Sequence, residues 1–309
     1  MRLIYDDIGC FLLLPQNYPQ QLRQFGIECV LFNPFRPFLT AKQNNRDHRK
    51  IISIDGKVAY TGGINLADEY INAIEKHGHW KDAGILVEGK AAWSFTIMFL
   101  EMWQICTGQR EDLQTYYPWS EQPCTVSGDG FVQPYADSPL DTENVGEHVY
   151  LQILNQAQDY VYINTPYLIV DDSMVSALTL AAKRGVDVRI ITPHRWDKWA
   201  IHMTTRSYYR DLVRAGVRVY EYEKGFMHAK TFVCDDRVAT VGTTNLDFRS
   251  LYLHFECGAL LFGGSVIRDI KQDFLTTLQT CRPILEESCC SNFFVHLFQE
   301  ILRLFAPLM

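Results

Sequence analysis

Two segments of the sequence carry a histidine and a lysine two residues apart. They are HRKIISIDGKVAYTGGINL, residues 48–66, and HAKTFVCDDRVATVGTTNL, residues 228–246. Because side chains alternate along a strand, His48 and Lys50 are expected on one face, as are His228 and Lys230. An imidazole beside an ammonium group suits attack on a phosphate ester, or donation of a proton to its leaving group. The pattern therefore predicts phosphate-ester chemistry.

The two segments are copies of one repeated unit. They align without gaps at an offset of 180 residues, and the histidine, lysine, aspartate and asparagine of one copy recur in the other. A match to three fixed residues has odds on the order of 10⁻⁴ per starting position, so two aligned matches are not explained by chance. Small residues before Asn65 and Asn245 allow the backbone and the side-chain amides to approach an anion closely.

Two such units in one chain can bring both histidines to one site. One histidine would attack phosphorus and form a phosphohistidine, while the other protonates the leaving alcohol and then deprotonates the incoming one. The lysines and asparagines would hold the equatorial oxygens of the phosphoryl group. This scheme requires no metal and no cofactor, and the nearby carboxylates form no recognisable set of metal ligands.

Four carboxylates accompany the repeated segments. Asp55 and Asp235 follow short apolar alternating runs, and Asp55 precedes a glycine, which is typical of a tight hairpin turn and favours a role in orienting the loop over direct chemistry. A catalytic histidine usually has a carboxylate that fixes its tautomer. Asp82 follows His48 by 34 residues and Glu256 follows His228 by 28, and this similar spacing favours such a role over an ordinary surface position.

Hydrophobic periodicity predicts the elements that position these residues. In the second copy, helices are expected at 150–157 and 173–184, with strands at 160–165 and from 186. The first copy opens directly on a core strand at residues 2–5, so about 40 residues of the corresponding unit have no counterpart. Matching helices are expected at 91–105 and 266–280, and residues 107–146 are predicted to be a linker with at most one strand.

Composition narrows the class of protein. The 309 residues are 47% hydrophobic and 21% charged, which is typical of a globular chain of one large or two average domains. The longest apolar run has five residues, so neither a membrane span nor a signal peptide is predicted. The net charge of −7 argues against a general nucleic-acid binder. Nine scattered cysteines without a C-x-x-C pair favour a reducing compartment over disulfides or a zinc site.

Taken together, the motifs resemble the phospholipase D superfamily, and nearly the whole chain resembles its bacterial cardiolipin synthases. Beyond the two H-x-K-x-x-x-x-D segments, the resemblance is carried by VQPYADSPLD, TPYLIVDD, RSYYRDLVRAGVRVYEYEKGF and VGTTNLDFRSLYLHFE. That family joins two phosphatidylglycerol molecules through a phosphatidyl-histidine and releases glycerol. The resemblance implies that the active-site residues are His48, Lys50, Asp55, His228, Lys230 and Asp235. It also implies that Asn65 and Asn245 are phosphate ligands and that Asp82 and Glu256 are the partners of the histidines.

The resemblance also implies an architecture. We expect an α/β protein of two pseudo-symmetric α/β/α halves with mixed sheets, residues 1–125 and 126–309, with the active site between them. It favours His48 as nucleophile and His228 as general acid, although exchanged roles would leave the sequence unchanged. Members of the family usually begin with two hydrophobic membrane segments and a fuller first unit, so the present chain resembles an N-terminally shortened member.

A lipid substrate requires contact with a membrane surface, and two segments are candidates for it. Residues 292–304 form an apolar helical pattern with a narrow polar stripe, typical of an interfacial helix or of a terminal helix docked on its domain. Trp196, Trp199 and Met203 lie among basic residues, although their spacing favours an inward-packed helix face. A peripheral protein on the cytoplasmic side of the cell membrane is therefore expected, without a nucleic-acid partner and with its oligomeric state open.

Three alternatives to a cardiolipin synthase remain from the sequence. Water suits the same phosphohistidine as an acceptor, so a hydrolytic phospholipase D is possible. A nuclease of the superfamily is disfavoured by the acidic composition. An inactive, membrane-associated fragment is the alternative from outside the enzymes, and it predicts an exposed sheet edge and no turnover.

Overall fold

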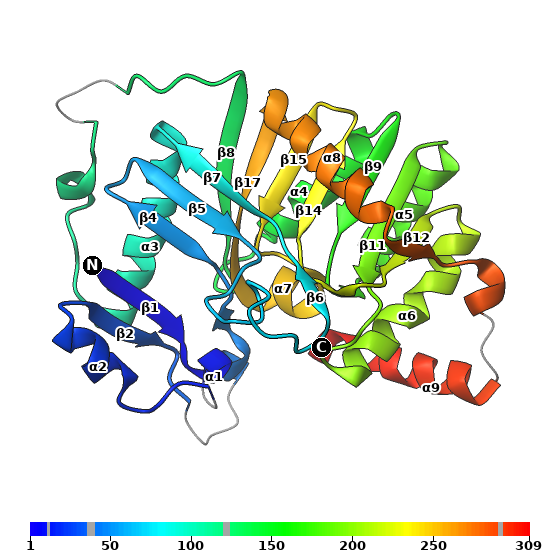
Figure 1. Cartoon of the computed structure of the whole chain (residues 1–309), viewed down its shortest axis with the longest axis horizontal. Coiled ribbons are helices and arrows are strands. Elements are labelled where there is room, and N and C mark those ends of the chain that lie inside the picture. Colours follow the sequence, from blue (N-terminus) through cyan, green and yellow to red (C-terminus); the bar gives the residue numbers. More distant parts are fainter. Residues whose placement is uncertain (11–12, 36–40, 120–123, 290–292) are drawn as a thin grey trace.

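The computed structural model describes residues 1–10, 13–35, 41–119, 124–289 and 293–309. The elements of the N-terminal part, as far as α3, lie beside those that follow, from β8 onward (Figure 1). Both parts combine helices with strands, and the strands are parallel in some pairs and antiparallel in others. The chain is therefore an α/β protein with mixed sheets, as the sequence predicts.

The largest sheet belongs mainly to the C-terminal part. Its strands follow the order β18, β12, β11, β9, β14, β15, β17 and β3, and β8 also pairs with β17. Their bounds are β3 (Arg46–Asp47), β8 (Gly130–Asp137), β9 (Tyr160–Asn164), β11 (Asp187–Pro193), β12 (Arg218–Tyr222), β14 (Thr231–Cys234), β15 (Val238–Gly242), β17 (His254–Gly263) and β18 (Cys281–Pro283). Strand β9 lies between the parallel and the antiparallel strands of this sheet, because it runs parallel to β11 and antiparallel to β14.

Helices cover both faces of this sheet. They are α4 (Val145–Gln156), α5 (Asp172–Lys183), α6 (Trp199–Arg214) and α8 (Ser265–Leu278). On one face the ring of Tyr150 in α4 stacks on Phe232 of β14, with centroids 4.1 Å apart. On the other, Phe274 of α8 stacks on Tyr162 of β9 at 4.8 Å. The predicted helices at 150–157, 173–184 and 266–280 are confirmed, and β8 is the single strand among the linker residues that the structure describes, 107–119 and 124–146.

The N-terminal part repeats this pattern on a smaller scale. Its elements are β1 (Arg2–Asp6), α2 (Tyr18–Gln24), β2 (Glu28–Phe32), β4 (Ile51–Ile54), β5 (Val58–Gly62), β7 (Gly84–Glu88) and α3 (Lys90–Thr107). Strands β1 and β2 are parallel, and β4, β5 and β7 form a separate antiparallel sheet. The pairing of Gly62 with Gly84 in β5 and β7 matches that of Gly242 with Gly258 in β15 and β17, so the sequence repeat is also a structural repeat.

One strand position is filled only in the second copy. There β9 bonds to β11 and to β14, whereas among the described residues β1 and β4, the equivalent strands of the first copy, lie in different sheets with no strand between them. The equivalent side chains differ accordingly: Phe232 is 1% exposed under α4, and Ile52 is 51% exposed. Within residues 1–10, 13–35 and 41–119, the first copy thus leaves open the strand position that β9 fills in the second.

Two short strand pairings join the copies. Strand β6 (His79–Lys81) runs parallel to β13 (Gly225–Met227), and β3 runs parallel to the start of β17. In each pairing, the strand that leads to a motif histidine in one copy lies beside the strand that leads to a carboxylate in the other. This arrangement sets the geometry of the site.

The remaining elements are short, apart from the C-terminal helix. They are α1 (Asp7–Cys10), η1 (Ala41–Asn44), η2 (Leu113–Tyr116), β10 (Leu168–Ile169), β16 (Leu246–Asp247), α7 (Phe248–Tyr252), η3 (Glu286–Cys289), α9 (Phe293–Leu304) and η4 (Ala306–Leu308). Helix α9 lies along α6 (Figure 1), where Arg303 bonds Asp211 at 3.0 Å. The predicted helix is thus confirmed, and Asn292, its expected first residue, lies outside the described residues. None of the described helices combines the length and hydrophobicity that crossing a membrane requires.

Candidate active site

The motif histidines lie at the ends of the strand pairings that join the copies. The backbone N–H of His48, directly after β3, donates to Phe255 O at 3.0 Å, and that of His228, after β13, donates to Lys81 O at 2.7 Å. The regular strands begin only at Ile51 and Thr231. The His-x-Lys residues therefore lie directly before the strands, and the prediction that they lie within them is wrong, because the backbone N–H of each histidine is bonded to the other copy of the unit.

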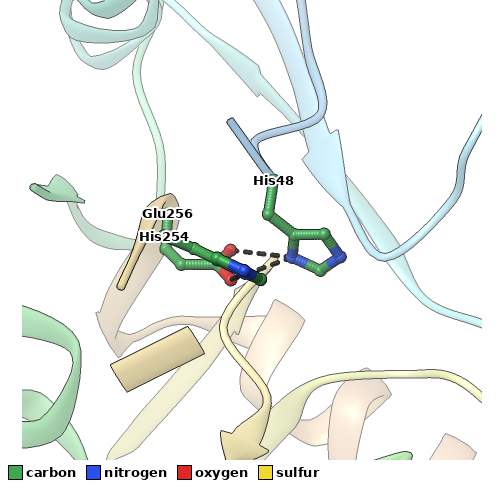
Figure 2. Close-up of side chains that lie close together, drawn as sticks. All are labelled: His48, His254 and Glu256. Atoms are coloured by element: carbon green, nitrogen blue, oxygen red, sulfur yellow. Dashed lines mark hydrogen bonds and ion pairs between the residues drawn. The ribbon is translucent and has the colours of Figure 1, made fainter. Parts of the chain in front are cut away.

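Each histidine is bonded to the carboxylate of the other copy. His48 Nδ1 lies 2.9 Å from Glu256 Oε1, and His228 Nδ1 lies 2.7 Å from Asp82 Oδ2. Figure 2 shows Nδ1 of His48 facing the carboxylate of Glu256. Asp82 and Glu256 are thus bonded to histidines in the structure. Along the sequence each carboxylate follows the histidine of its own copy, but in the structure it is bonded to the histidine of the other copy. With Nδ1 of each ring held, Nε2 remains for chemistry.

The two carboxylates differ in their surroundings. Glu256 is fully buried and accepts hydrogen bonds from the hydroxyls of Thr243 and Ser250, the latter at 2.6 Å. Burial raises the pKa of Glu256 above its ordinary value. For Asp82, burial acts in the same direction, but its interactions with His228 and then with Lys230 outweigh it and hold the pKa below the usual value. Asp82 is therefore the more firmly ionised partner.

Close approach of the two copies at Asp82 depends on a glycine. The N–H of Gly63 donates to Ala83 O at 3.0 Å, directly after Asp82. A methyl group at Gly63 would overlap Asp82 Oδ1 and lie 2.9 Å from His228 O. The absence of a side chain at position 63 thus lets the loop of the first copy pack against the Asp82–His228 pair.

Two lysines bring positive charge to the histidines. Lys50 Nζ donates to His48 O, and Lys230 Nζ donates to His228 O, each at 2.5 Å. Lys230 Nζ also lies 2.9 Å from His228 Nδ1. Burial lowers the pKa of Lys50 to about 8 and that of Lys230 to about 7. Two buried ammonium groups with readily lost protons are the donors expected at a site for a phosphate group.

The histidines themselves are held neutral in the unliganded chain. Burial, followed by the charge of Lys230, lowers the pKa of His228 to about 4. Burial likewise lowers the pKa of His48, and the charges of Lys50, Lys230 and His228 act in the same direction. These mutual effects show that the motif residues of both copies share one electrostatic environment.

The asparagines lie beside this group. Asn65 donates from Nδ2 to the hydroxyl of Tyr70 at 2.5 Å, and the ring of Tyr70 meets that of His228 edge-on at 5.2 Å. Asn245 is 6% exposed, and its buried Oδ1 has no hydrogen-bond partner. Both positions are compatible with the predicted role in phosphate binding.

Asp55 and Asp235 are not brought to the histidines. Both are turn residues with positive φ, at the far ends of β4 and β14 from the lysines. The carboxylate of Asp235 accepts the backbone N–H groups of Gln158, Asp159 and Tyr160 at 2.8 to 3.0 Å. A strand rise of about 3.3 Å per residue places this turn roughly 16 Å from Lys230. The structure therefore corrects their inclusion among the active-site residues: Asp235 anchors a loop, and Asp55 occupies the equivalent turn.

Two aromatic residues at the site were not found from the sequence. The ring of His254 lies 5.7 Å from that of His48, and the ring of Trp80 lies 5.2 Å from that of His228. Strand pairing makes Trp80 and His254 equivalent, but at an offset of 174 residues rather than 180. The gapless alignment does not extend across this change, so only the strand register relates the two.

His48, His254 and Glu256 also place one possible metal-ligating atom each within 4.8 Å of one another (Figure 2). His48 and Glu256 are already bonded to each other, and both ring nitrogens of His254 are buried without a hydrogen-bond partner. The positive charge of Lys50 acts to lower the pKa of Glu256, against the effect of burial. A further cation would be repelled by Lys50 and would have to separate His48 from Glu256, so this donor set fits an anion better than a metal ion.

The chain is similar to several known proteins. The family model described as "Cardiolipin synthase, PLD-like domain" matches residues 150–278. A cardiolipin synthase of Alkalihalophilus pseudofirmus is 38% identical over 312 residues, which cover 100% of this chain and 61% of the relative. An uncharacterized protein of Streptococcus mutans serotype c is 46% identical over 311 residues, covering 100% of this chain and 67% of the relative.

A solved structure shares the fold. The phosphatidylserine synthase of Haemophilus influenzae superposes with a TM-score of 0.71 at 15% identity, over 100% of this chain and 80% of the other. The chain spans about 61% of the length of the curated cardiolipin synthase from A. pseudofirmus. With the matching domain and a similarity that covers the whole of this chain, the chain belongs to the family of phospholipase D-like proteins that includes the bacterial cardiolipin synthases.

Proposed function

We propose that the protein is a phosphatidyltransferase that joins two phosphatidylglycerol molecules into cardiolipin and releases glycerol. The observation that carries this proposal is the pair of histidines, each with Nδ1 on a buried carboxylate, in one environment with two buried lysines. Two imidazoles provide a nucleophile and an acid, and the lysines provide charge for the phosphate oxygens. The similarity to cardiolipin synthases supports a phospholipid as the substrate.

The surroundings of the two histidines support different roles for them. His48 is paired with Glu256, whose pKa is raised by burial, so its neutral imidazole is well suited to attack phosphorus. His228 is paired with Asp82, which stays ionised and stabilises an imidazolium. We therefore assign His48 as the nucleophile and His228 as the general acid.

Binding of the donor raises the pKa of His228, so that the ring takes up the proton that a general acid needs. The pKa of His228 is about 4 in the unliganded site, which is too low for a general acid at neutral pH. A phosphodiester charge about 4 Å away contributes about 4 kcal/mol at an effective dielectric constant of about 20. Since one pKa unit corresponds to about 1.36 kcal/mol, this charge raises the pKa of His228 by about 3 units, to near neutrality.

The reaction then proceeds in two balanced steps. Nε2 of His48 attacks phosphorus, the bond from phosphorus to the glycerol headgroup oxygen breaks, and His228 gives its proton to that oxygen. Free glycerol leaves, and the phosphatidyl group remains on His48. His228 next takes the proton from a headgroup hydroxyl of the second phosphatidylglycerol, whose oxygen attacks phosphorus as the phosphorus–nitrogen bond breaks. Cardiolipin leaves, and both histidines return to their starting states.

Lys50, Lys230, Asn65 and Asn245 are assigned to the phosphate oxygens, and no metal ion takes part in the scheme. Charge that develops on the equatorial oxygens would be met by the two ammonium groups, which burial has already removed from water. The protein would act from the cytoplasmic face of the cell membrane as a peripheral enzyme.

The test incubates the full chain with phosphatidylglycerol vesicles that carry a labelled headgroup, in the presence of a chelator. Cardiolipin and free glycerol are expected, and both should be lost in His48→Ala and His228→Ala. Phosphatidic acid as the only product would replace the proposal with a hydrolytic phospholipase D. A folded chain without any product would point instead to an inactive member of the family.

A second measurement tests the assignment of the histidines. After rapid acid-free quenching, a labelled phosphatidyl group should be recovered on His48 in the unchanged protein. It should be absent in His48→Ala, and in Glu256→Gln it should still form at a reduced rate. Label recovered on His228 would reverse the assignment.

A further inference from the structure

Exposed apolar side chains gather on one loop beside His228. The loop between β5 and β6, residues 63–78, presents Ile64, Leu66, Ile71 and Ile74 to solvent, and Leu66 is 89% exposed. The same loop carries Tyr70, whose ring meets that of His228 at 5.2 Å, and Asn65, which bonds Tyr70. One wall of the candidate site is thus the inner side of a loop whose outer side is apolar.

A second exposed apolar segment borders the site from the C-terminal copy. Trp196 and Trp199, at the start of α6, are each about half exposed, so the expected inward packing of these tryptophans is wrong. Between them, Asp197 accepts a hydrogen bond from Tyr167 at 2.5 Å, and the Tyr167 ring lies 6.4 Å from Phe226. The Phe226 ring in turn lies 6.0 Å from His228.

The two segments are neighbours. Arg195 Nη1 lies 3.9 Å from Glu75 Oε1, so the segment before α6 contacts the loop that carries Leu66. Together they line two sides of the region around His228. A protein partner seated across both segments would cover this region, whereas a lipid surface would present headgroups to it.

Helix α9 extends this surface along α6. Arg303 holds the helix in place through Asp211 and the ring of Tyr208, over which it lies at 4.4 Å. Phe298 contacts Trp199 with ring centroids 5.7 Å apart. The outward side of the helix exposes further apolar side chains, namely Leu297, Ile301 and Leu304. Trp199 therefore connects the rim of the site to an apolar helix face.

We propose that loop 63–78, Trp196, Trp199 and the outer face of α9 form one docking surface that enters the interfacial region of a lipid bilayer. This inference rests on the proposed function for its choice of a lipid surface. Isoleucine, leucine and tryptophan side chains beside a lipid site are suited to the boundary between headgroups and acyl chains. An apolar surface of this extent is unusual unless it binds something.

Apolar contact is expected to dominate over charge at this surface. Arg195 and Lys76 are already within 4 Å of Glu75 and Glu69, respectively, and the exposed Lys198 follows Asp197 in the sequence, so the two segments together carry no net positive charge. Paired charges contribute little attraction to anionic lipids. Binding to vesicles should therefore survive an increase in salt from 0.1 to 0.5 M, which separates this surface from one that relies on basic residues.

Leucine-to-glutamate variants of the full chain provide the test. Leu66→Glu changes the loop and Leu297→Glu changes α9, while Leu180→Glu serves as the matched control. Leu180 is an exposed leucine, 57%, near the C-terminal end of α5, and Leu297 is 48% exposed on its own helix. Leu180 lies on a part of the molecule away from the histidines. The side chain of Arg184, one helical turn further on, donates to Asn155 O, close to the turn that Asp235 anchors.

Sedimentation with phosphatidylglycerol–phosphatidylethanolamine vesicles gives the partition coefficient. We expect a loss of at least tenfold for Leu66→Glu and for Leu297→Glu, and less than twofold for Leu180→Glu. Unchanged melting temperatures would exclude misfolding. The proposal would be overturned if Leu66→Glu and Leu297→Glu both bound vesicles as strongly as the unchanged protein. It would also be overturned if the unchanged protein were a dimer, and Leu297→Glu converted it to a monomer that does not bind vesicles.

Turnover of dihexanoyl phosphatidylglycerol below its micellar concentration separates this inference from the proposed function. Leu297→Glu should retain that turnover while losing turnover on vesicles, because the dispersed lipid needs no docking surface. Vesicle binding that depends on Leu66 and Leu297 supports the docking surface even if neither substrate is turned over, and that result would count against the proposed function alone.

Discussion

Asp82→Asn isolates the charge that one copy of the unit supplies to the histidine of the other. Asparagine keeps the volume of the side chain and a hydrogen-bond acceptor at 2.7 Å from His228 Nδ1, and removes only the negative charge. The Asp82 side chain is 3% exposed and that of His228 is 8% exposed, so water cannot replace the lost charge. The imidazolium of His228 would then form without its counter-ion.

The magnitude follows from the distance. With charge centres about 4 Å apart and an effective dielectric constant of about 20, the pair is worth about 4 kcal/mol. Since about 1.36 kcal/mol corresponds to a tenfold change in rate, turnover of phosphatidylglycerol should fall by about 10³-fold. The loss should lie in protonation of the leaving glycerol, the step assigned to His228.

The assay compares two donors. A phosphatidyl donor with p-nitrophenol as its headgroup needs no proton on its leaving group, so Asp82→Asn should release nitrophenol in the first turnover at nearly the unchanged rate. Asp273→Asn is the matched control, because Asp273 bonds Lys81, the neighbour of Asp82, at 2.7 Å on the surface. An equal loss on both donors would refute the reasoning, since it would mean that Asp82 only maintains the fold of the site.

Three further predictions test other parts of the structure. Gly63→Ala should displace Asp82, lower turnover about as much as Asp82→Asn, and reduce the free energy of unfolding by about 1–3 kcal/mol in urea. Lys230 loses its proton as the pH rises through about 7, so KM should rise above that pH, and Lys230→Arg, which stays charged, should shift the rise to higher pH. Phe232→Ala should cost about 3–5 kcal/mol in urea unfolding, and Ile52→Ala less than about 1 kcal/mol, because only Phe232 is covered by a helix.

Each of these has a result that would contradict it. Gly128→Ala is the control for Gly63→Ala, because a methyl group there meets no atom closer than 3.9 Å, and equal effects of the two would remove the steric argument. A KM that stays constant from pH 6 to pH 9 in the unchanged protein would show that Lys230 does not hold the phosphate. Similar losses in the free energy of unfolding for Phe232→Ala and Ile52→Ala would mean that the side chains at positions 232 and 52 are equally covered.

Much of the fold follows from local patterns. The helices at 150–157, 173–184 and 266–280 have clear apolar periodicity, and the hairpin turns at Asp55 and Asp235 have turn residues between alternating runs, so they could be predicted from sequence. The repeat also gives the histidines and the lysines, since identity at a fixed offset needs no knowledge of the fold. Asp82 and Glu256 were found from their similar spacing behind the two histidines.

The pairing of those residues could not be predicted in the same way. It depends on β6 and β13, which have three residues each and show no periodicity, and on two residues of β3. These short strands pair because the backbone of one copy meets that of the other, and a contact of that kind leaves no local pattern. His254 was missed for a related reason: its equivalence to Trp80 rests on strand register, after loops of different length have shifted the offset.

The exchange of carboxylates between the two copies has a consequence for how such a chain can evolve. The two pairs are His48 with Glu256 and His228 with Asp82. This is the reciprocal pattern that a twofold axis produces when two identical subunits meet. A single ancestral unit with this surface would have completed its site only as a dimer of two identical chains. Once both copies lie in one polypeptide, a change at the histidine or the carboxylate of either copy alters an acid–base pair that it shares with the other.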